Sequence, residues 1–283
     1  MNYIIIGKNI NFDISENIFT HGNFILSENH FQIKEIGFVM NLYSSLFPTT
    51  YGIQYLPPNF PGPNQRLFFS QASRKAAMVA ENPEWTKFTI YADENQPEAI
   101  QELILVGFYS YMSLRQTLLM HASAVNWNGQ GLVFTAPSGT GKTTQAELWA
   151  RYKGAKILNG DKVFLKQEED AIHAWGSPWK GSSPYALNES APLKAIVVLR
   201  QAKENTIRRL DTLEVMELFV PHVFFPKWDE KCEQAVLDFL DVVMSQTPIY
   251  LLCCRPDEEA VELTERTIFG ENTGKIHGEP YEK

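Results

Sequence analysis

The segment that most constrains this fold is the glycine-rich run at residues 131–149, GLVFTAPSGTGKTTQAELW. Its first five residues form an apolar stretch typical of a buried strand, and the residues from Thr143 onward are typical of a helix. A tight loop therefore joins a strand directly to the start of a helix. In that context the pattern GxxxxGK[ST] indicates a phosphate-binding loop.

The loop composition has a physical explanation. Gly139 and Gly141 lack Cβ atoms, so the backbone can curl and point successive N–H groups inward. These donors and the positive end of the following helix suit the oxygens of a β-phosphate. Lys142 can reach β- and γ-phosphate oxygens, and the Thr143 hydroxyl can bind Mg²⁺.

We therefore predict a nucleotide site that uses ATP and Mg²⁺ as cofactors, although the loop alone would also suit GTP, ADP or pyrophosphate. The predicted phosphate-binding residues are Pro137, Ser138, Gly139, Thr140, Gly141, Lys142, Thr143 and Thr144. One position departs from the pattern, because Ala136 stands where the first glycine is usual. Alanine tolerates positive φ poorly, so either Ala136 keeps a negative φ or the loop opens differently.

Composition limits the classes of partner. The chain has 283 residues and a formal net charge of −8. Nucleic acids and anionic membranes reward clustered basic residues, so neither is expected as the main partner. The longest apolar stretch, residues 99–120, contains Glu102, Arg115 and Gln116 and predicts a buried helix, not a membrane span.

Cysteine usage indicates the compartment. Cys232, Cys253 and Cys254 form neither a disulfide framework nor a CxxC zinc pair. The N-terminus has no basic region or cleavage-like site before its short apolar run. We expect reduced thiols in a cytoplasmic protein. The oligomeric state is left open.

Three regions are predicted along the chain. Residues 1–95 are expected to form a small, mostly β N-terminal subdomain with strands at 3–6, 24–27 and 88–92, and no regular element at 57–65, which is rich in proline. Residues 96–270 should form the domain with the phosphate loop, and residues 271–283 a polar tail. The domain should open with a long helix over 97–120.

The rest of the domain reads as alternating strands and helices. Strands are predicted at 122–127 and 131–135, joined by an Asn128–Gly129 hairpin, which is a strong hairpin signal. Further strands are expected at 156–158, 162–166, 171–175, 194–200, 206–210 and 249–253, with the third of these paired to the second. Helices are expected at 143–152, 211–220, 230–245 and 257–269.

Three further residues are candidates for the site. Asp161, in the run ILNGDKV, follows Lys142 by roughly twenty residues, so it can bind Mg²⁺, accept a proton from an attacking hydroxyl, or simply stabilise a turn. His121 opens the strand before the loop strand and is by itself as typical of a packed histidine. Lys180, in GSPWKGSS, is either a cation on a lid or part of a surface loop.

Taken together, HASAV, APSGTGKTT and LNGDKV occur in an order that resembles the kinase domain of HPr kinase/phosphorylase and its relatives. The loop string also resembles that of ATP-dependent phosphoenolpyruvate (PEP) carboxykinase. The likeness covers residues 120–269 in element order and is strongest from His121 to Leu165. It implies an α/β fold with a PEP-carboxykinase-like P-loop core, a mixed twisted sheet and flanking helices.

The resemblance also implies roles for residues. Lys142 and Thr143 take the phosphate and metal roles, Asp161 matches the second of two paired aspartates, and His121 matches a histidine near the acceptor hydroxyl. Catalytic residues would then be Asp161, His121 and Lys142, with Thr143 and Asp161 on the metal. Gly160 stands where the family often has its first aspartate, and the family's glycine- and arginine-rich downstream segment has no match.

Two functional hypotheses follow. The first is an HPr kinase-like, ATP-dependent phosphotransferase that acts on a hydroxyl, either a serine of a peptide or protein or a small alcohol, with Lys180 near the substrate. The second is a nucleotide-binding accessory or regulatory protein without phosphotransfer, which Gly160 and the missing downstream segment favour. Carboxykinase-like lyase chemistry is disfavoured, because no second metal site can be assembled from the sequence.

Overall fold

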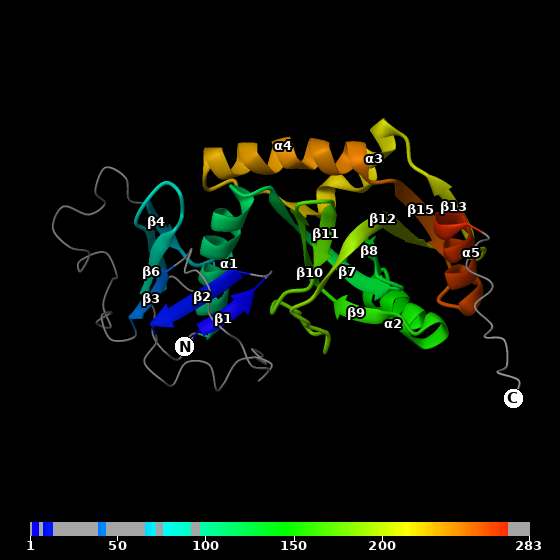
Figure 1. Cartoon of the computed structure of the whole chain (residues 1–283), viewed down its shortest axis with the longest axis horizontal. Helices are drawn as coiled ribbons and strands as arrows, with labels where there is room; N and C mark the ends of the chain where they lie inside the picture. The colour runs from blue at the N-terminus through cyan, green and yellow to red at the C-terminus, as the bar shows by residue number, and fades with distance from the viewer. Residues whose placement is uncertain are drawn as a thin grey trace, which may run out of the picture.

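The computed structural model describes residues 2–5, 8–13, 39–43, 66–71, 76–91 and 97–270. These residues form an α/β structure with two sheets and flanking helices (Figure 1). The first sheet is built from the N-terminal region and the second, larger and mixed, from residue 117 onward. This mixed sheet with its helices is the α/β architecture predicted from the sequence.

The N-terminal sheet has six strands in the order β1-β2-β3-β6-β5-β4. They are β1 (Asn2–Ile5), β2 (Lys8–Asp13), β3 (Val39–Tyr43), β4 (Arg66–Phe69), β5 (Ala77–Ala80) and β6 (Lys87–Tyr91). The strands expected at 3–6 and 88–92 are present, each one residue earlier. The segments 24–27 and 57–65 lie outside the described residues.

The helix expected over 97–120 is wrong at its C-terminal end. Helix α1 covers Pro97–Ser113, and Gln116 has a φ of 49° that stops any helical continuation. Strand β7 then runs from Thr117 to Trp127. Its apolar residues are buried in a sheet, and a continuous apolar run has no periodicity that separates buried strand from buried helix.

The second sheet has nine strands, in the order β11-β10-β7-β8-β12-β15-β13, with β9 and β14 also paired to β7. The strands after β7 are β8 (Gln130–Thr135), β9 (Lys156–Asn159), β10 (Lys162–Gln167), β11 (Ile172–Trp175), β12 (Ser190–Gln201), β13 (Thr206–Arg209), β14 (Val223–Phe224) and β15 (Ile249–Cys254). Strands β8, β12 and β15 are parallel neighbours. The predicted pairing of β11 with β10 is confirmed.

The hairpin between β7 and β8 is also confirmed. Trp127 pairs with Gln130 across a two-residue turn. Asn128 and Gly129 have φ angles of 51° and 78°, the left-handed values that a type I′ turn requires at both positions.

The remaining helices lie where they were expected, with shifted ends. They are α2 (Lys142–Lys153), α3 (Thr212–Leu218), the 3-10 turn η1 (Val220–His222), α4 (Glu230–Gln246) and α5 (Glu258–Phe269). Helix α3 is shorter than the predicted 211–220, because Asp211 is its N-cap residue and Pro221 lies in the following turn. Among the described residues, no helix is long and apolar enough to cross a membrane.

Two apolar layers cover the larger sheet. Along β12, Ile196 and Val198 belong to the core that includes α1 and α4, whereas Ala195 and Val197 belong to the core that includes α2 and α5. Figure 1 shows α4 along one side of the sheet and α2 toward the other. Burial on both faces explains why β12 is apolar without alternation.

The first of these cores continues into the N-terminal region. Trp85 and Phe88 are buried in the same cluster as α1 and α4. The Trp85 Nε1 atom donates a hydrogen bond to Asp229 Oδ2 at 2.9 Å, next to the start of α4. A shared apolar core therefore crosses the predicted boundary at residue 95.

Candidate functional site

The candidate site lies where β7 changes partners. On one side, β8 ends at Thr135, opposite Ala122, so Ala136 leaves the sheet beside His121. On the other side, β9 ends opposite Ala124 and β10 begins opposite His121, which leaves the turn 160–161 between them. Two loops thus emerge on either side of His121. The first leaves the carboxyl end of β8, which is parallel to β12, and ligands of α/β sheets commonly bind beyond the carboxyl ends of such strands.

The loop at 136–141 has the backbone that its glycines predict. Gly139 and Gly141 have φ angles of 78° and 114°, and Gly141 is the N-cap residue of α2. Ala136 is not among the described non-glycine residues with positive φ. The first of the two possibilities raised by its sequence therefore holds, and alanine is tolerated there without strain.

Lys142 folds back over this loop. Its side-chain Nζ donates hydrogen bonds to the carbonyl oxygens of Ala136 at 3.0 Å and Pro137 at 3.3 Å. Burial lowers the pKa of Lys142, and the charge of Asp161 acts in the opposite direction. The cation is held in the curve of the loop, where an anion would meet it.

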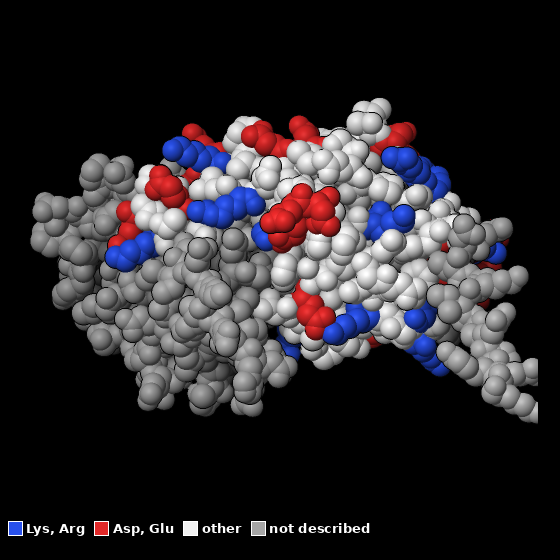
Figure 2. Space-filling model, in the orientation of Figure 1, with Lys and Arg blue, Asp and Glu red and all other residues white. Residues whose placement is uncertain are grey.

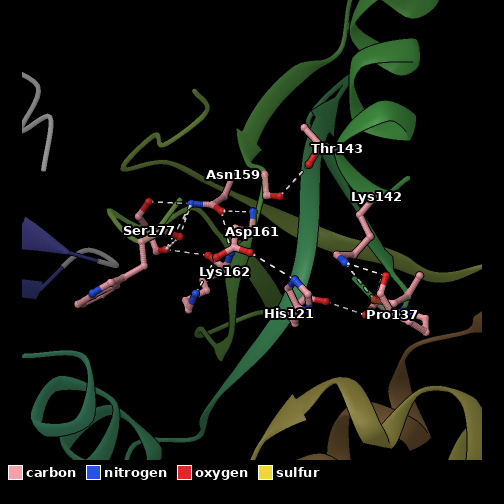
Figure 3. A network of polar contacts seen from close by, with 12 residues as sticks. His121, Pro137, Lys142, Thr143, Asn159, Asp161, Lys162 and Ser177 are labelled. Carbon is pink, nitrogen blue, oxygen red and sulfur yellow. Dashed lines mark hydrogen bonds and ion pairs between the residues drawn. The ribbon is translucent and has the colours of Figure 1, made fainter. Parts of the chain in front are cut away.

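Asp161 faces the same space from the other side of β7 (Figure 3). Its Oδ1 lies 3.3 Å from His121 Nε2, and its Oδ2 accepts a hydrogen bond from Lys162 Nζ at 2.6 Å. Burial by itself raises the pKa of Asp161, but the hydrogen bonds from His121 and Lys162 outweigh it and bring the pKa to about 2. The group is a carboxylate at neutral pH.

Asn159 holds this turn in place and was missed from the sequence. It is fully buried. Its Oδ1 accepts hydrogen bonds from the backbone N–H groups of Asp161 at 2.7 Å and Lys162 at 2.9 Å, and its Nδ2 donates to the Ser177 carbonyl oxygen at 2.7 Å. Such turns are favoured by asparagine, so the Asn-Gly-Asp run carried a usable signal.

Gly160 has a neighbour that explains its lack of a side chain. A Cβ atom at Gly160 would lie 2.0 Å from Ser183 Oγ, and the Gly160 carbonyl oxygen accepts a hydrogen bond from Thr143 Oγ1 at 3.0 Å. Gly181, with a φ of 56°, packs in the same way against the Asp161 carboxyl. The Ser183 side chain therefore occupies the space that an acidic side chain at position 160 would need.

A cavity of about 450 Å³, here called the central cavity, joins these parts. Its walls include His121, Lys142, Thr143, Asp161 and Lys180. Ser138, Gly139, Gly141 and Thr144 complete the loop side. Pro137 and Thr140 line neighbouring cavities instead. The structure thus brings the three candidates outside the loop, His121, Asp161 and Lys180, to one space.

Oxygen atoms of the kind that bind Mg²⁺ line the central cavity. Thr143 and Asp161 each offer an oxygen to it. Among the described residues, no group of three or more His, Cys, Asp and Glu side chains could hold a metal ion. Two oxygen ligands are what Mg²⁺ commonly takes from a protein, because it keeps several waters and binds substrate phosphates.

A row of basic side chains crosses the strands at this level. Lys162 lies opposite His121 in the β10–β7 pairing. Because Val223 pairs with Met120 in the antiparallel β14–β7 pair, His222 lies beside His121 on the other side. Burial lowers the pKa of His222, as do the charges of Lys142 and His121. Neither Lys162 nor His222 was predicted, and nothing local in the sequence marks His222.

The surface charge agrees with the composition. Figure 2 shows basic and acidic side chains interspersed on one face, without an extended basic area among the described residues.

Comparisons with known proteins give limited matches. The family model of the SynChlorMet cassette protein ScmC matches residues 90–217, less than half of the chain. No curated protein matches. Among solved structures, the HPr(Ser) kinase/phosphatase from Coxiella burnetii is similar over 53% of this chain and 95% of its own, at 13% identity and a TM-score of 0.32. That TM-score does not establish a common fold.

The contact between Gly160 and Ser183 can be tested by a double-mutant cycle. Gly160→Ala should lower the free energy of unfolding by about 1–3 kcal/mol, because the added methyl group overlaps Ser183. Ser183→Gly removes the overlapping atoms, so the double variant should be more stable than the sum of the two single changes predicts. Urea denaturation measures all four proteins. Strict additivity would show that the two residues do not collide.

The ion contacts of Asp161 predict a pH effect on stability. Its pKa in the folded protein is about 2, below the ordinary 3.8, so its contribution is full above pH 4 and is lost as the pH falls toward 2. That contribution is about 2 kcal/mol. Asp161→Asn should flatten the stability curve over this pH interval in denaturant titrations. Glu169→Gln, at an exposed carboxyl, should keep the wild-type slope.

Proposed function

We propose that this chain is an ATP-dependent phosphotransferase that transfers phosphate to a hydroxyl group, either of a serine in a peptide or protein or of a small alcohol. One observation carries the proposal. His121 and the ionised Asp161 share a cavity with Lys142 and Thr143, at the mouth of a glycine loop that opens a helix. A P-loop core of the PEP-carboxykinase type is the corresponding fold proposal.

The phosphate chain of ATP fits along the loop. Backbone N–H groups at 138–144 and the start of α2 would bind its oxygens, and Lys142 would neutralise the β- and γ-phosphates. Thr143 and Asp161 would hold Mg²⁺, which neutralises charge on the transferred group. Lys142 would have to exchange its two carbonyl partners for phosphate oxygens, which are stronger acceptors because they are charged.

The nucleoside would occupy a second cavity of about 440 Å³, which is lined by Gly141, Thr144, Gln145, Arg200 and Arg255. It is here called the α5 cavity, because Arg255 lies in the segment that leads into α5. Gln145 is 3% exposed, and its Nε2 has no hydrogen-bond partner among the described residues. A buried amide donor without a partner is costly, so a polar ligand atom there would be stabilising. A base or ribose would supply such an atom.

Asp161 would act on the acceptor chiefly through its charge. Because its pKa is about 2, it is a weak base while His121 and Lys162 donate to it. It would bind the metal and orient the hydroxyl, or take its proton once these contacts loosen. The hydroxyl oxygen forms the new bond to the γ-phosphorus as the bond to the ADP oxygen breaks. His121 would place the hydroxyl, and Lys180 would cover the phosphates.

A nucleotide-binding accessory protein without transfer is the second candidate. The contact of Gly160 with Ser183 favours it, because the acidic side chain found there in the kinase family has no space. The matched family name, a cassette protein, specifies no activity. The two candidates agree on nucleotide binding and differ on Asp161.

Nucleotide binding should depend on Lys142. Lys142→Ala removes a charge-assisted contact, which contributes about 1.5–3 kcal/mol, so Mg·ATP should bind about ten-fold or more weakly by calorimetry. Lys156→Ala removes a solvent-exposed lysine paired with Glu189 and should bind as the wild type does. Equal affinities of the two variants would contradict the nucleotide site.

Transfer should depend on Asp161 more than binding does. Asp161→Asn keeps the shape but removes the charge, so transfer of label from [γ-³²P]ATP to a mixture of serine peptides and small alcohols should fall about 10²-fold. Mg·ATP affinity should fall less than transfer does, because Thr143 and the phosphates still hold the metal. Asp170→Asn is the control for loss of one carboxylate. Label transfer that is equally fast in Asp161→Asn would exclude its assigned role, and no transfer by the wild type would favour the accessory protein.

A further inference from the structure

A third cavity borders the same loop from another side. It has a volume of about 590 Å³ and is here called the η1 cavity. Gly139 belongs to the η1, α5 and central cavities alike, so all three meet at the loop. Their other loop residues overlap only in part, and the residues that are not shared order the cavities along a bound phosphate chain.

The loop residues place the η1 cavity at the γ-phosphate end. Pro137 and Ser138 line it, whereas Gly141 and Thr144 line the α5 cavity. Lys142 Nζ lies against the carbonyls of Ala136 and Pro137, and in such loops this lysine meets the β- and γ-phosphates. A chain with its nucleoside in the α5 cavity therefore ends beside the η1 cavity.

The lining of the η1 cavity is amphipathic. Leu199, Leu218, Pro221 and Leu251 contribute apolar walls. Its polar groups are the basic Arg200, the acidic Glu217, the Gln201 amide and the His222 imidazole. Pockets of this kind fix a ligand through apolar contact and orient it through a few polar atoms.

His222 links this cavity to the reacting groups. It lines the η1 cavity, and the strand register places it beside His121, which in turn contacts Asp161. A hydroxyl bound at His222 would therefore lie at the junction of the two cavities, next to the γ-phosphate end. Because burial and the neighbouring charges lower its pKa, the imidazole is mainly neutral at pH 7 and can accept a hydrogen bond.

The apolar surface continues out of the cavity along α3. Leu213 is 81% exposed and Met216 is 51% exposed. Glu217, which lines the cavity, follows Leu213 by four residues, so the two share a helical face. Met216 follows Leu213 by three residues and lies beside it on the helix. A small alcohol would leave this surface uncovered, whereas an extended chain would cover it.

Resting on the proposed phosphotransfer, we propose that the η1 cavity binds the acceptor, which is a peptide segment with an aliphatic residue near its reacting serine. His222 accepts a hydrogen bond from the serine hydroxyl and so places it beside His121. The aliphatic residue packs on Leu218 and Leu251, and the flanking peptide lies over Leu213 and Met216. The central cavity then holds the phosphates, and the α5 cavity the nucleoside.

The test uses short peptides that each contain one serine, together with [γ-³²P]ATP and Mg²⁺. The peptides are divided into pools, and each pool has one fixed type of residue next to the serine. Pools with Leu, Ile or Met near the serine should be labelled faster than pools with Asp or Gly. Leu213→Lys should raise KM for the best pool about ten-fold without changing kcat or Mg·ATP affinity. Leu237→Lys, at an exposed leucine on α4, is the matched control and should leave KM unchanged.

His222 is tested by two variants. His222→Gln keeps a hydrogen-bond acceptor and should retain most of the transfer, whereas His222→Phe keeps ring shape and should lose about ten-fold or more of kcat. Both should bind Mg·ATP as the wild type does. Thermal denaturation identifies a variant that is merely misfolded. His222→Asn, which keeps an acceptor, then replaces His222→Gln, and His222→Ala, which has none, replaces His222→Phe.

The outcomes separate this proposal from the one it rests on. Binding of Mg·ATP with label entering only small alcohols, or no acceptor, overturns the peptide cavity and leaves the nucleotide site intact. Labelled peptides with unchanged kinetics in Leu213→Lys and His222→Phe place the acceptor elsewhere and also overturn it. If the wild-type protein does not bind Mg·ATP, both proposals are contradicted.

Discussion

The arrangement of the site depends on β7 continuing past the ends of its neighbours. Most strands in this sheet pair with one partner on each side along their length, but β7 has four partners and exchanges them near His121. Where one partner strand ends and the next begins, a loop leaves the sheet, and the backbone N–H and C=O groups of β7 there need other hydrogen-bond partners. Thr135 Oγ1 donates to the His121 carbonyl, and the Ala122 N–H donates to the Asp161 carbonyl. The loop after β8 and the turn at 160–161 are thus both hydrogen-bonded to β7 at neighbouring residues, and this fixes the distance between them.

Electrostatics then decides what this geometry can do. A carboxylate that is partly buried beside a histidine and a lysine is ionised and oriented, so it suits binding of a cation more than abstraction of a proton. Lys142, on the opposite wall, is desolvated and held by carbonyls that a charged ligand can replace. The central cavity therefore offers negative and positive groups on different walls, as Mg²⁺ and a phosphate chain require. The same separation would serve binding without transfer.

The sequence predicted what local pattern controls. The glycine loop, the Asn128–Gly129 hairpin and the order of strands and helices after it follow from backbone preferences of neighbouring residues, and these parts of the fold agree with prediction. The end of α1 did not, because the apolar residues 118–120 suit a buried helix as well as a buried strand, and only pairing with β10 and β14 selects the strand. His222 was missed for a related reason. It lies close to His121 because the two-residue strand β14 pairs with β7, about a hundred residues earlier in the chain. Asn159 was missed because the Asn-Gly-Asp turn was interpreted only through Asp161.

The contact between Gly160 and Ser183 has a consequence for related chains. Two positions that compete for one volume cannot both carry large side chains, so their identities should vary together across homologous sequences. Where position 160 is acidic, the side chain equivalent to Ser183 has to move aside or be reduced to glycine. Where position 160 is glycine, a serine or another small residue fits at position 183. This pair would then sort homologues into those with two carboxylates facing the central cavity and those with one, before any of them is assayed.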